Sequence, residues 1–372
     1  MEKTVKIGIV GVGNIGSVHL STLAKNKIKG GVLSGACDID AQKLKALKDA
    51  YPQLSLFEDY EDLLNSGIDA VIIATPHYLH PIIAERAIEK GIHVLIEKPF
   101  GVFTKGGKAL CQRARDKGVV FGIMLNQRTN KLFSLAHELV KNGEIGKIRR
   151  HVWIITNWYR TQEYYESDSW RGSWQGEGGG VLLNQAPHNL DLWQWICGMP
   201  KSIYAICKNG KYHDISVEDE ATIFAEYENG ATGTFITTTG DKYGTNRLEI
   251  SGERGSIVLE KGKLILQRDG QAPRTFRDKE YNGHLEIVQD FTNAILYKKE
   301  LLAPASEGLK SLEISNCAYL SSYKNEKVDL PINEDEFLEF LDIMQKNEDP
   351  VSKNETDKPL SSTYQAKWNT NW

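Results

Sequence analysis

The chain has 372 residues, of which 41% are hydrophobic and 25% are charged, close to the composition of an ordinary globular protein. This length predicts two packed domains. The formal net charge of −4 lacks the concentrated positive field that nucleic acid binding requires. The chain contains neither a secretion signal nor an apolar run of the roughly twenty residues that cross a bilayer. We therefore expect a cytoplasmic protein that binds neither nucleic acid nor a membrane.

The cysteines are five in number, widely scattered, and never spaced as a CxxC pair. Such a distribution predicts neither a disulfide framework nor a zinc site. We expect reduced thiols and no bound metal.

Short apolar runs alternate with helical stretches over the first third of the chain. The expected strands cover residues 5–10, 32–37, 54–57, 69–74, 92–97 and 119–124, and the expected helices lie near 14–26, 41–50, 79–90 and 104–117. This alternation is typical of an α/β fold with a doubly wound parallel sheet. We therefore predict a first domain over residues 1–125.

The pattern changes after residue 125. A helix near 130–142 and a strand at 149–158 precede strand candidates at 202–208, 220–227, 231–239, 246–251, 256–259 and 263–268, and helices near 284–299, 305–323 and 334–346 follow. Turn residues separate these strands at hairpin spacing. The sequence therefore predicts an α+β domain over 126–335 with a large open, mostly antiparallel sheet and helices on one side. A C-terminal helix and tail cover 336–372.

The tail after Lys353 is polar but contains Trp368 and Trp372. Disorder is the default for such a terminus. Docking of the two tryptophans on a neighbouring subunit is the alternative.

A glycine-rich turn joins the first expected strand to the first expected helix. Gly11, Gly13 and Gly16 stand in a GxGxxG pattern, with Asn14 and Ile15 between the last two glycines. In this context the glycines allow a tight turn, close approach of a pyrophosphate, and packing of the helix on the strand. The helix N-terminus then offers free N–H groups to the phosphates. The turn predicts a dinucleotide site.

The second expected strand ends in Asp38, about twenty residues beyond the glycines. A carboxylate at this place accepts hydrogen bonds from an adenosine ribose diol and repels a 2′-phosphate. We therefore expect NAD rather than NADP. The alternative role of Asp38 is to cap the following helix.

The strand expected at 69–74 is also followed by polar residues. Thr75 and Pro76 follow the strand at 69–74, with His77 and His80 just beyond. Ligands bind at this edge of such sheets, so these residues are candidates for the nicotinamide side. The two histidines are equally explained as residues at the start of a helix.

Glu97 and Lys98 close the strand at 92–97. A lysine at the carboxyl edge of the sheet can donate a hydrogen bond to a substrate oxygen, and desolvation lowers its pKa toward a range useful for proton transfer. We therefore consider Lys98 a candidate catalytic residue.

Three polar residues follow Gly178-Gly179-Gly180 at helical spacing: Asn184, His188 and Asp191. In a helix this spacing places them on one face. Pro187 favours the first turn of a helix, so Asn184 stands at or before the helix start. His188 is the candidate base for a hydroxyl proton. Its alternative role is that of a structural histidine beside Trp193 and Trp195.

Together these residues resemble the glucose-fructose oxidoreductase, inositol dehydrogenase and MocA family (Gfo/Idh/MocA). The resemblance covers nearly the whole chain: the glycine turn, Glu97-Lys98-Pro99, Asn126-Gln127-Arg128, and the three glycines before His188. It implies a Rossmann domain, a substrate domain with an open sheet, NAD(P)-linked oxidation or reduction of sugars and cyclic polyols, and oligomers, either dimers or tetramers, formed through that sheet. It also implies catalytic roles for Lys98 and His188, cofactor contacts at Glu97, Lys98, Asn126 and Gln127, and a cis bond between Lys98 and Pro99.

The chain departs from the family pattern at Asn184, where many members carry aspartate. An asparagine cannot accept a proton but can orient a hydroxyl. Proton transfer is then expected at His188 with help from Lys98. Asparagine at this position also resembles members that act on nucleotide-linked sugars.

Six tryptophans fall within about forty residues, interleaved with tyrosines and arginines. Apolar aromatic faces beside hydrogen-bonding groups suit a sugar ring. We consider Trp158, Arg160, Arg171 and Asp191 candidate substrate residues, the arginines also being able to pair with a carboxylate or phosphate. For any single tryptophan, ordinary core packing is the simpler explanation.

These observations predict an NAD-dependent dehydrogenase that oxidises a secondary ring hydroxyl of a sugar, sugar derivative or cyclic polyol, or reduces the ketone. One alternative is a glycosidase that uses transient oxidation by bound NAD. The other is a ligand-sensing regulator that keeps the fold without the chemistry.

Overall fold

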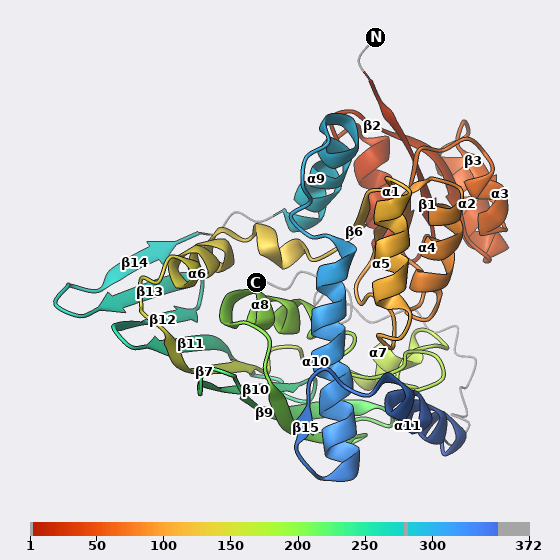
Figure 1. Ribbon diagram of the computed structural model, residues 1–372. Helices are drawn as coiled ribbons and strands as arrows, with labels where there is room; N and C mark the ends of the chain where they lie inside the picture. Colours follow the sequence, from red (N-terminus) through yellow and green to blue (C-terminus); the bar gives the residue numbers. More distant parts are fainter. Residues whose placement is uncertain (1–2, 279–281, 349–372) are drawn as a thin grey trace. The chain divides into compact units, whose positions relative to one another are not determined.

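The computed structural model describes residues 3–278 and 282–348, and the chain divides into two compact units (Figure 1). The first unit comprises residues 1–129 and 281–309, and the second comprises 130–280 and 310–372. Trp368 and Trp372 lie outside the described residues. No helix among the residues that are described has both the length and the apolar character needed to cross a membrane.

The first unit is built on a six-stranded parallel sheet of order β3-β2-β1-β4-β5-β6. Its strands are β1 (Val5–Val10), β2 (Gly31–Cys37), β3 (Ser55–Phe57), β4 (Ala70–Ile73), β5 (His93–Ile96) and β6 (Phe121–Ile123). Its connecting helices are α1 (Asn14–Ala24), α2 (Ala41–Ala50), α3 (Tyr60–Leu64), α4 (Leu79–Glu89) and α5 (Gly107–Asp116). The predicted doubly wound sheet is confirmed, and α3 is an addition to it.

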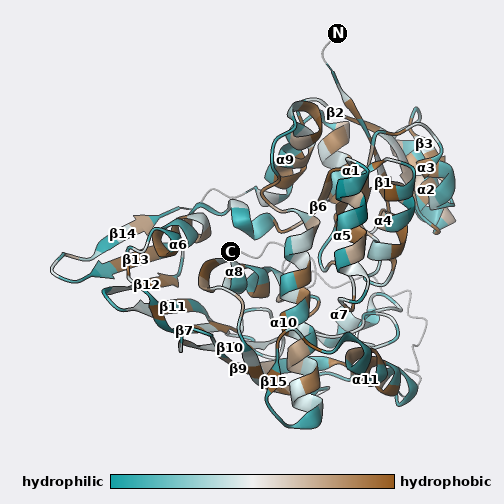
Figure 2. Ribbon diagram, viewed as in Figure 1, coloured by the Kyte–Doolittle hydropathy of each residue, from teal (hydrophilic) through white to brown (hydrophobic). Residues whose placement is uncertain are grey.

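The central strands owe their position to apolar side chains on both faces. All four residues of β4 are buried, as are Ile7 and Ile9 of β1. In Figure 2 strand β1 carries mostly the hydrophobic colour, while the helices around it carry both colours. A strand covered by helices on two sides requires this pattern.

A helix from late in the sequence completes the first unit. Helix α9 (Gly283–Tyr297) packs on β1, on β5 and on the 3₁₀ helix η1 (Asn126–Thr129). Its buried face includes Ile287, Val288 and Phe291. The predicted boundaries therefore differ from those of the structure, because periodicity predicts a helix without identifying the sheet that buries it.

The second unit contains a nine-stranded mixed sheet of order β14-β13-β12-β11-β7-β10-β9-β8-β15. The strands are β7 (Ile148–Ile155), β8 (Ser202–Asn209), β9 (Glu218–Glu226), β10 (Thr232–Thr238), β11 (Asn246–Gly252), β12 (Gly255–Glu260), β13 (Lys263–Arg268), β14 (Arg274–Arg277) and β15 (Val328–Asp329). Strands β7 and β10 are parallel, and the other neighbouring pairs are antiparallel. The predicted open, mostly antiparallel sheet is confirmed, with two short edge strands that were not predicted.

Helices gather on one side of this sheet. Helices α6 (Lys131–Lys141) and α8 (Pro187–Cys197) pack on each other above the strands in Figure 1. The remaining helices are α7 (Gln162–Glu166), α10 (Ala305–Lys324), which begins in the first unit, and α11 (Glu334–Lys346). Burial alternates along β10, where Phe235 is buried and its neighbours are half-buried, so one face of the strand forms the core.

Candidate active site

The glycine turn of the first unit has the features that a dinucleotide requires. Gly11 has a φ of +86°, and a Cβ atom at Gly11 or Gly16 would clash with neighbouring backbone. Around Gly13 a Cβ atom would meet nothing within 4 Å, so open space lies beside the backbone there. No side chain in the described ranges caps α1. The N–H groups at Asn14 and Ile15 therefore stand at a helix start suited to a pyrophosphate.

Asp38 braces this turn from the end of β2. Its Oδ2 accepts the Val12 N–H at 2.8 Å, and its Oδ1 accepts the Asp40 N–H at 3.0 Å. Helix α2 is capped by Asp40, whose side chain accepts from the backbone of Gln42 and Lys43. The alternative cap role of Asp38 is therefore wrong. A carboxylate has further lone pairs, which suit a ribose diol.

Several buried polar atoms of the first unit fit a polar ligand. Thr75 Oγ1, which lies just before Pro76, Asn126 Oδ1 and both amide atoms of Gln127 lack a hydrogen-bond partner within the described part of the chain. Buried polar atoms are normally paired, so such atoms mark places where water or a ligand binds. These hydrogen-bonding atoms and the open glycine turn together fit NAD.

Glu97 lies at the centre of a buried cluster beside Lys98. Its Oε1 lies 2.8 Å from His19 Nε2, and its Oε2 accepts the Lys98 N–H at 3.2 Å. Burial alone would raise the pKa of Glu97, but the hydrogen bond from His19 and the positive charge around it hold that pKa at about 2. His284 belongs to the same cluster, with its ring 5.8 Å from that of His19.

His19 and His284 were not predicted from the sequence, because they lie far from Glu97 along the chain and belong to no motif. Asn126 Nδ2 lies 3.1 Å from His284 Nδ1, so α9 supports the predicted cofactor residue Asn126. Burial lowers the pKa of His284. The cis bond between Lys98 and Pro99, implied by the family resemblance, is present.

His80 joins the turns that follow β4 and β5. Its Nδ1 lies 2.8 Å from Pro99 O, and its Nε2 lies 2.8 Å from Thr75 O. Burial lowers its pKa. The side chain therefore holds together the two segments that carry Thr75 and Lys98, and His77 is buried next to it.

In the second unit, α8 begins at Pro187, as a residue without an N–H group favours. Asn184 precedes the helix, as the position of Pro187 predicts. His188 and Asp191 are both in the helix, and 7% and 1% of their surfaces are exposed. Asp191 Oδ1 accepts from Gln194 Nε2 at 3.1 Å.

Asn184 belongs to a buried polar network that the sequence analysis did not detect. Its Nδ2 donates to a carboxylate oxygen of Glu177 and, at 3.1 Å, to the Tyr164 hydroxyl. The same hydroxyl accepts from Arg171 Nη1 at 2.6 Å, and Arg171 Nε donates to Asp168 at 3.0 Å. Glu177 and Tyr164 carry no motif signal, and folding alone brings them to Asn184.

The two candidate arginines both lie over the Tyr164 ring, at 5.1 Å for Arg160 and 4.5 Å for Arg171. Arg160 Nη1 also donates to the carbonyl groups of Trp158 and Tyr159. The predicted aromatic and basic residues Trp158, Arg160 and Arg171 are therefore neighbours in the structure.

Several members of the tryptophan cluster pack in the aromatic core of the second unit. Trp153 and Trp193 are completely buried and pack on Phe235, while Trp174 packs on Phe340. Large apolar rings stabilise a core by the area that they remove from water. The aromatic run therefore serves packing at these positions.

Glu218 supports the loop that leads to Asn184. Its carboxyl group accepts from Gly180 N at 2.7 Å, from Leu182 N at 2.8 Å and from the Tyr319 hydroxyl at 2.8 Å. Burial raises the pKa of Glu218 to about 7, against the three hydrogen bonds, which lower it.

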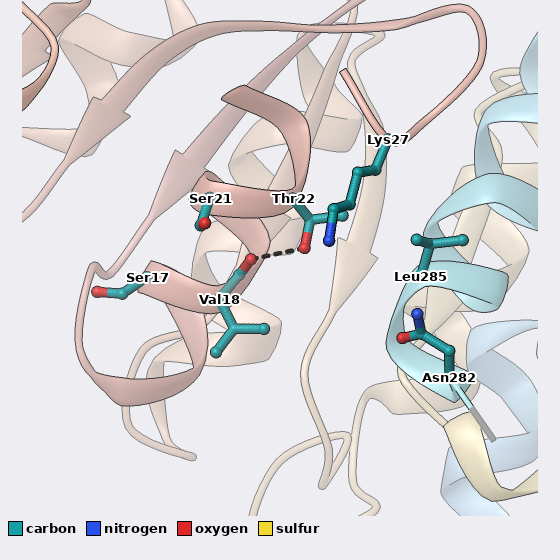
Figure 3. Close-up of a pocket in the computed structure, with 7 residues that line it drawn as sticks. All are labelled: Ser17, Val18, Ser21, Thr22, Lys27, Asn282 and Leu285. Carbon is teal, nitrogen blue, oxygen red and sulfur yellow. Dashed lines mark hydrogen bonds between the residues drawn. The ribbon is translucent and has the colours of Figure 1, made fainter. Parts of the chain in front are cut away.

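A cavity of about 420 Å³ in the first unit lies between α1 and α9 (Figure 3). Its lining consists of Ser17, Val18, Ser21, Thr22, Lys27, Asn282 and Leu285. None of the predicted site residues lines it. Thr22 Oγ1 donates to Val18 O inside the helix, so this hydroxyl is already used by the fold.

Comparison with known proteins gives matches over both units. Residues 5–125 match the model of an oxidoreductase family with an NAD-binding Rossmann fold, and residues 133–258 match the GFO/IDH/MocA C-terminal domain. A scyllo-inositol 2-dehydrogenase (NAD(+)) of Bacillus subtilis is 26% identical over 87% of this chain and 96% of its own. A myo-inositol 2-dehydrogenase of Thermotoga maritima is 23% identical over 87% of this chain and 98% of its own.

Solved structures agree with these matches. The WlbA dehydrogenase from Bordetella pertussis, solved in complex with NADH and UDP-GlcNAcA, is 26% identical and superimposes with a TM-score of 0.80. The match covers 89% of this chain and 100% of WlbA. The two family models together match most of the chain, residues 5–125 and 133–258. The chain therefore belongs to the GFO/IDH/MocA family and is an NAD(P)-dependent oxidoreductase with an NAD-binding Rossmann domain.

Proposed function

We propose that the protein is an NAD-dependent dehydrogenase that oxidises a secondary ring hydroxyl of a sugar, sugar derivative or cyclic polyol, or reduces the corresponding ketone. One observation carries the proposal: the open glycine turn and the proposed base occur in the same chain. The turn is in the first unit, and His188 is in the second, at the start of α8 and four residues after Asn184. Two of the relatives that span most of the chain are inositol dehydrogenases, which supports a ring polyol as substrate.

The cofactor residues have defined roles in this proposal. The turn at Gly13 and the first residues of α1 bind the pyrophosphate, and the Asp38 carboxylate accepts hydrogen bonds from the ribose diol. When bound, NAD supplies an acceptor for the hydride that leaves the carbinol carbon.

The reacting oxygen then depends on two side chains. The Lys98 ammonium donates a hydrogen bond to it, and the His188 imidazole takes its proton during oxidation or returns the proton during reduction. Asn184 orients the ring by binding a hydroxyl.

Turnover is tested by nicotinamide absorbance with NAD and myo-inositol, scyllo-inositol, levoglucosan and UDP-GlcNAcA. The last compound is included because Asn184 resembles members that act on nucleotide-linked sugars and because WlbA binds it. We expect Lys98→Ala and His188→Ala to lower kcat by roughly 10²–10⁴ while keeping NAD affinity. Unchanged rates in both variants would refute these assignments.

The cofactor site is tested separately with Gly13→Ala. The open space at this position lets the variant fold, but the added methyl group occupies the approach of the pyrophosphate. We expect normal thermal stability with NAD affinity lowered at least about tenfold. Ser21→Ala on the same helix is the control, and equal NAD binding by both variants would contradict the placement.

We also propose a homo-oligomer formed through the open face of the nine-stranded sheet. Tyr204 on β8 lies directly opposite Phe224 on β9, and both side chains are more than one-third exposed, as is Ile206. Apolar side chains grouped on one sheet face favour association. Sedimentation of Phe224→Glu is expected to show smaller particles than the unaltered protein, and an unchanged mass would exclude this face.

A further inference from the structure

Glu177 is a buried glutamate whose carboxyl group contacts Asn184, the residue that stands where many family members carry aspartate. Only 1% of its surface is exposed. One carboxylate oxygen accepts the Gly172 N–H at 2.7 Å, and the other accepts from Asn184 Nδ2. Glu177 therefore bridges the backbone of its own loop and the amide that the proposed function assigns to substrate binding.

Both carboxyl oxygens of Glu177 act as acceptors in these two contacts, whereas an amide side chain can donate from one end and accept at the other. Glu177 therefore decides which end of Asn184 faces it. The amide nitrogen must turn toward the carboxylate, and its other hydrogen is directed at the Tyr164 hydroxyl, 3.1 Å away.

Tyr164 reinforces this orientation. Its hydroxyl oxygen accepts from Arg171 Nη1 at 2.6 Å, and a guanidinium has no acceptor atom. Arg171 in turn is held by Asp168. The oxygen of Tyr164 therefore acts as an acceptor, for Asn184 and, at 3.2 Å, for Gln185 Nε2 as well. Both hydrogens of the Asn184 amide are committed to protein atoms.

We propose that Glu177 is a positioning residue that makes Asn184 a hydrogen-bond acceptor, so that its Oδ1 binds a hydroxyl hydrogen of a ring polyol. This inference rests on the proposed function and specifies its substrate contact. An asparagine without such a partner could rotate its amide and donate to a carbonyl oxygen instead. With Glu177 in place, Asn184 performs the accepting role of a carboxylate without adding a charge.

The contact between the two side chains is tested without substrate. In protein labelled with ¹⁵N-asparagine, the side-chain NH₂ signal that disappears in Asn184→Asp identifies Asn184. We expect Glu177→Gln to shift that signal, because the acceptor-only partner is lost. Glu166→Gln on the exposed end of α7 is the control and is expected to leave it in place. An Asn184 signal unmoved by Glu177→Gln would overturn the proposal whether or not a substrate is known.

The consequence for binding is tested with whichever of the four ring compounds named above is turned over. Glu177→Gln is expected to lower kcat/KM by roughly three- to tenfold, mainly through KM, since one oriented hydrogen bond is lost. Asn184→Asp places two carboxylates in contact and is expected to make kcat/KM fall where both ionise.

The double variant Glu177→Gln with Asn184→Asp exchanges the two roles. The introduced amide would donate to the introduced carboxylate, whose remaining oxygen can only accept. We expect this variant to recover kcat/KM to within about threefold of the unaltered enzyme, a non-additive result typical of residues in contact. A double variant no better than the poorer single variant would overturn the proposal. Absence of turnover by the unaltered protein on all four compounds would instead count against the proposed function, and the NMR result would then decide on Glu177.

Discussion

Glu97 in the first unit and Glu218 in the second are both buried beside a candidate catalytic segment, and the two carboxyl groups differ in their partners. Glu97 in the first unit faces His19 and precedes Lys98. Glu218 in the second unit accepts from two backbone N–H groups and the Tyr319 hydroxyl, and it holds the loop before Asn184. The pKa of Glu97 is lowered to about 2, whereas that of Glu218 is raised to about 7.

The difference shows what decides the charge of a buried carboxyl group. Both groups lose water, which favours the protonated form. An imidazole that can carry a proton offsets this loss at Glu97 through charge as well as hydrogen bonding. Neutral donors offset only part of it at Glu218. The number of hydrogen bonds therefore predicts ionisation less well than the charge of the donors.

The largest effect in this comparison is expected for Glu218→Gln. Both oxygens of the Glu218 carboxyl group accept hydrogen bonds. When the group is protonated, its hydroxyl oxygen can still accept a hydrogen bond, whereas the amide nitrogen of glutamine cannot. We expect a loss of roughly 3–5 kcal/mol in the free energy of unfolding at pH 5. Urea denaturation measures it, with Glu226→Gln at the partly exposed end of the same strand as control. Equal losses in the two variants would remove the special role of Glu218.

The pH dependence of stability is the next effect in size. Because the folded pKa of Glu218 lies above the usual value of 4.5, its contribution is fully present below pH 4.5 and is lost as the pH rises through about 7. The loss is at most about 3–4 kcal/mol, since one pKa unit corresponds to roughly 1.4 kcal/mol and the shift from 4.5 to about 7 spans between two and three units. Amide hydrogen exchange of β9 at several pH values measures it. A stability difference from Glu218→Gln that stays constant from pH 4.5 to 8 would contradict the raised pKa.

Glu97→Gln is expected to have a smaller effect of the opposite pH dependence. The amide oxygen of the variant can still accept a hydrogen bond from the His19 ring, so the loss at pH 7 is expected to be roughly 1–2 kcal/mol. The folded pKa of Glu97 is depressed, so its contribution is present above pH 4.5 and is lost as the pH falls toward 2. Amide hydrogen exchange of the β1 residues at several pH values measures this change in stability. A difference from the unaltered protein that grows on acidification would rule out this account.

The smallest effect is expected for Tyr319→Phe. The variant removes one of the three donors to Glu218 and leaves the ring in contact with Trp174. We expect a loss of about 1 kcal/mol, together with a further rise in the pKa of Glu218. Urea denaturation at pH 5 and pH 8 measures both. A variant as unstable as Glu218→Gln would mean that the ring packing, rather than the hydroxyl, is essential.

Most secondary structure could be predicted from local patterns. The apolar runs at Val5–Val10 and Ala70–Ile73 predict buried strands. The glycine pattern after β1 predicts a tight turn, and Gly11 adopts the positive φ that such a turn requires. The position of Pro187 likewise predicts the start of α8. Short elements such as α3, β14 and β15 escaped prediction, because two to five residues carry no reliable periodicity.

Partners distant in sequence could not be predicted. His19 meets Glu97 across 78 positions, and Tyr319 meets Glu218 across 101. Nothing in the local sequence around Glu177 distinguishes it from an exposed glutamate. Helix α9 could be predicted as a helix but not as part of the first unit.

The sequence by itself determined the order of strands and helices, the dinucleotide turn and the identity of the candidate residues Lys98, Asn184 and His188, because these depend on periodicity, glycine geometry and residue chemistry along a short stretch of chain. The tertiary structure alone decided the partners of each buried polar group. Those partners set the ionisation of Glu97 and Glu218 and the orientation of the Asn184 amide, because charge and hydrogen bonding in a buried site depend on groups that only folding brings within a few ångströms.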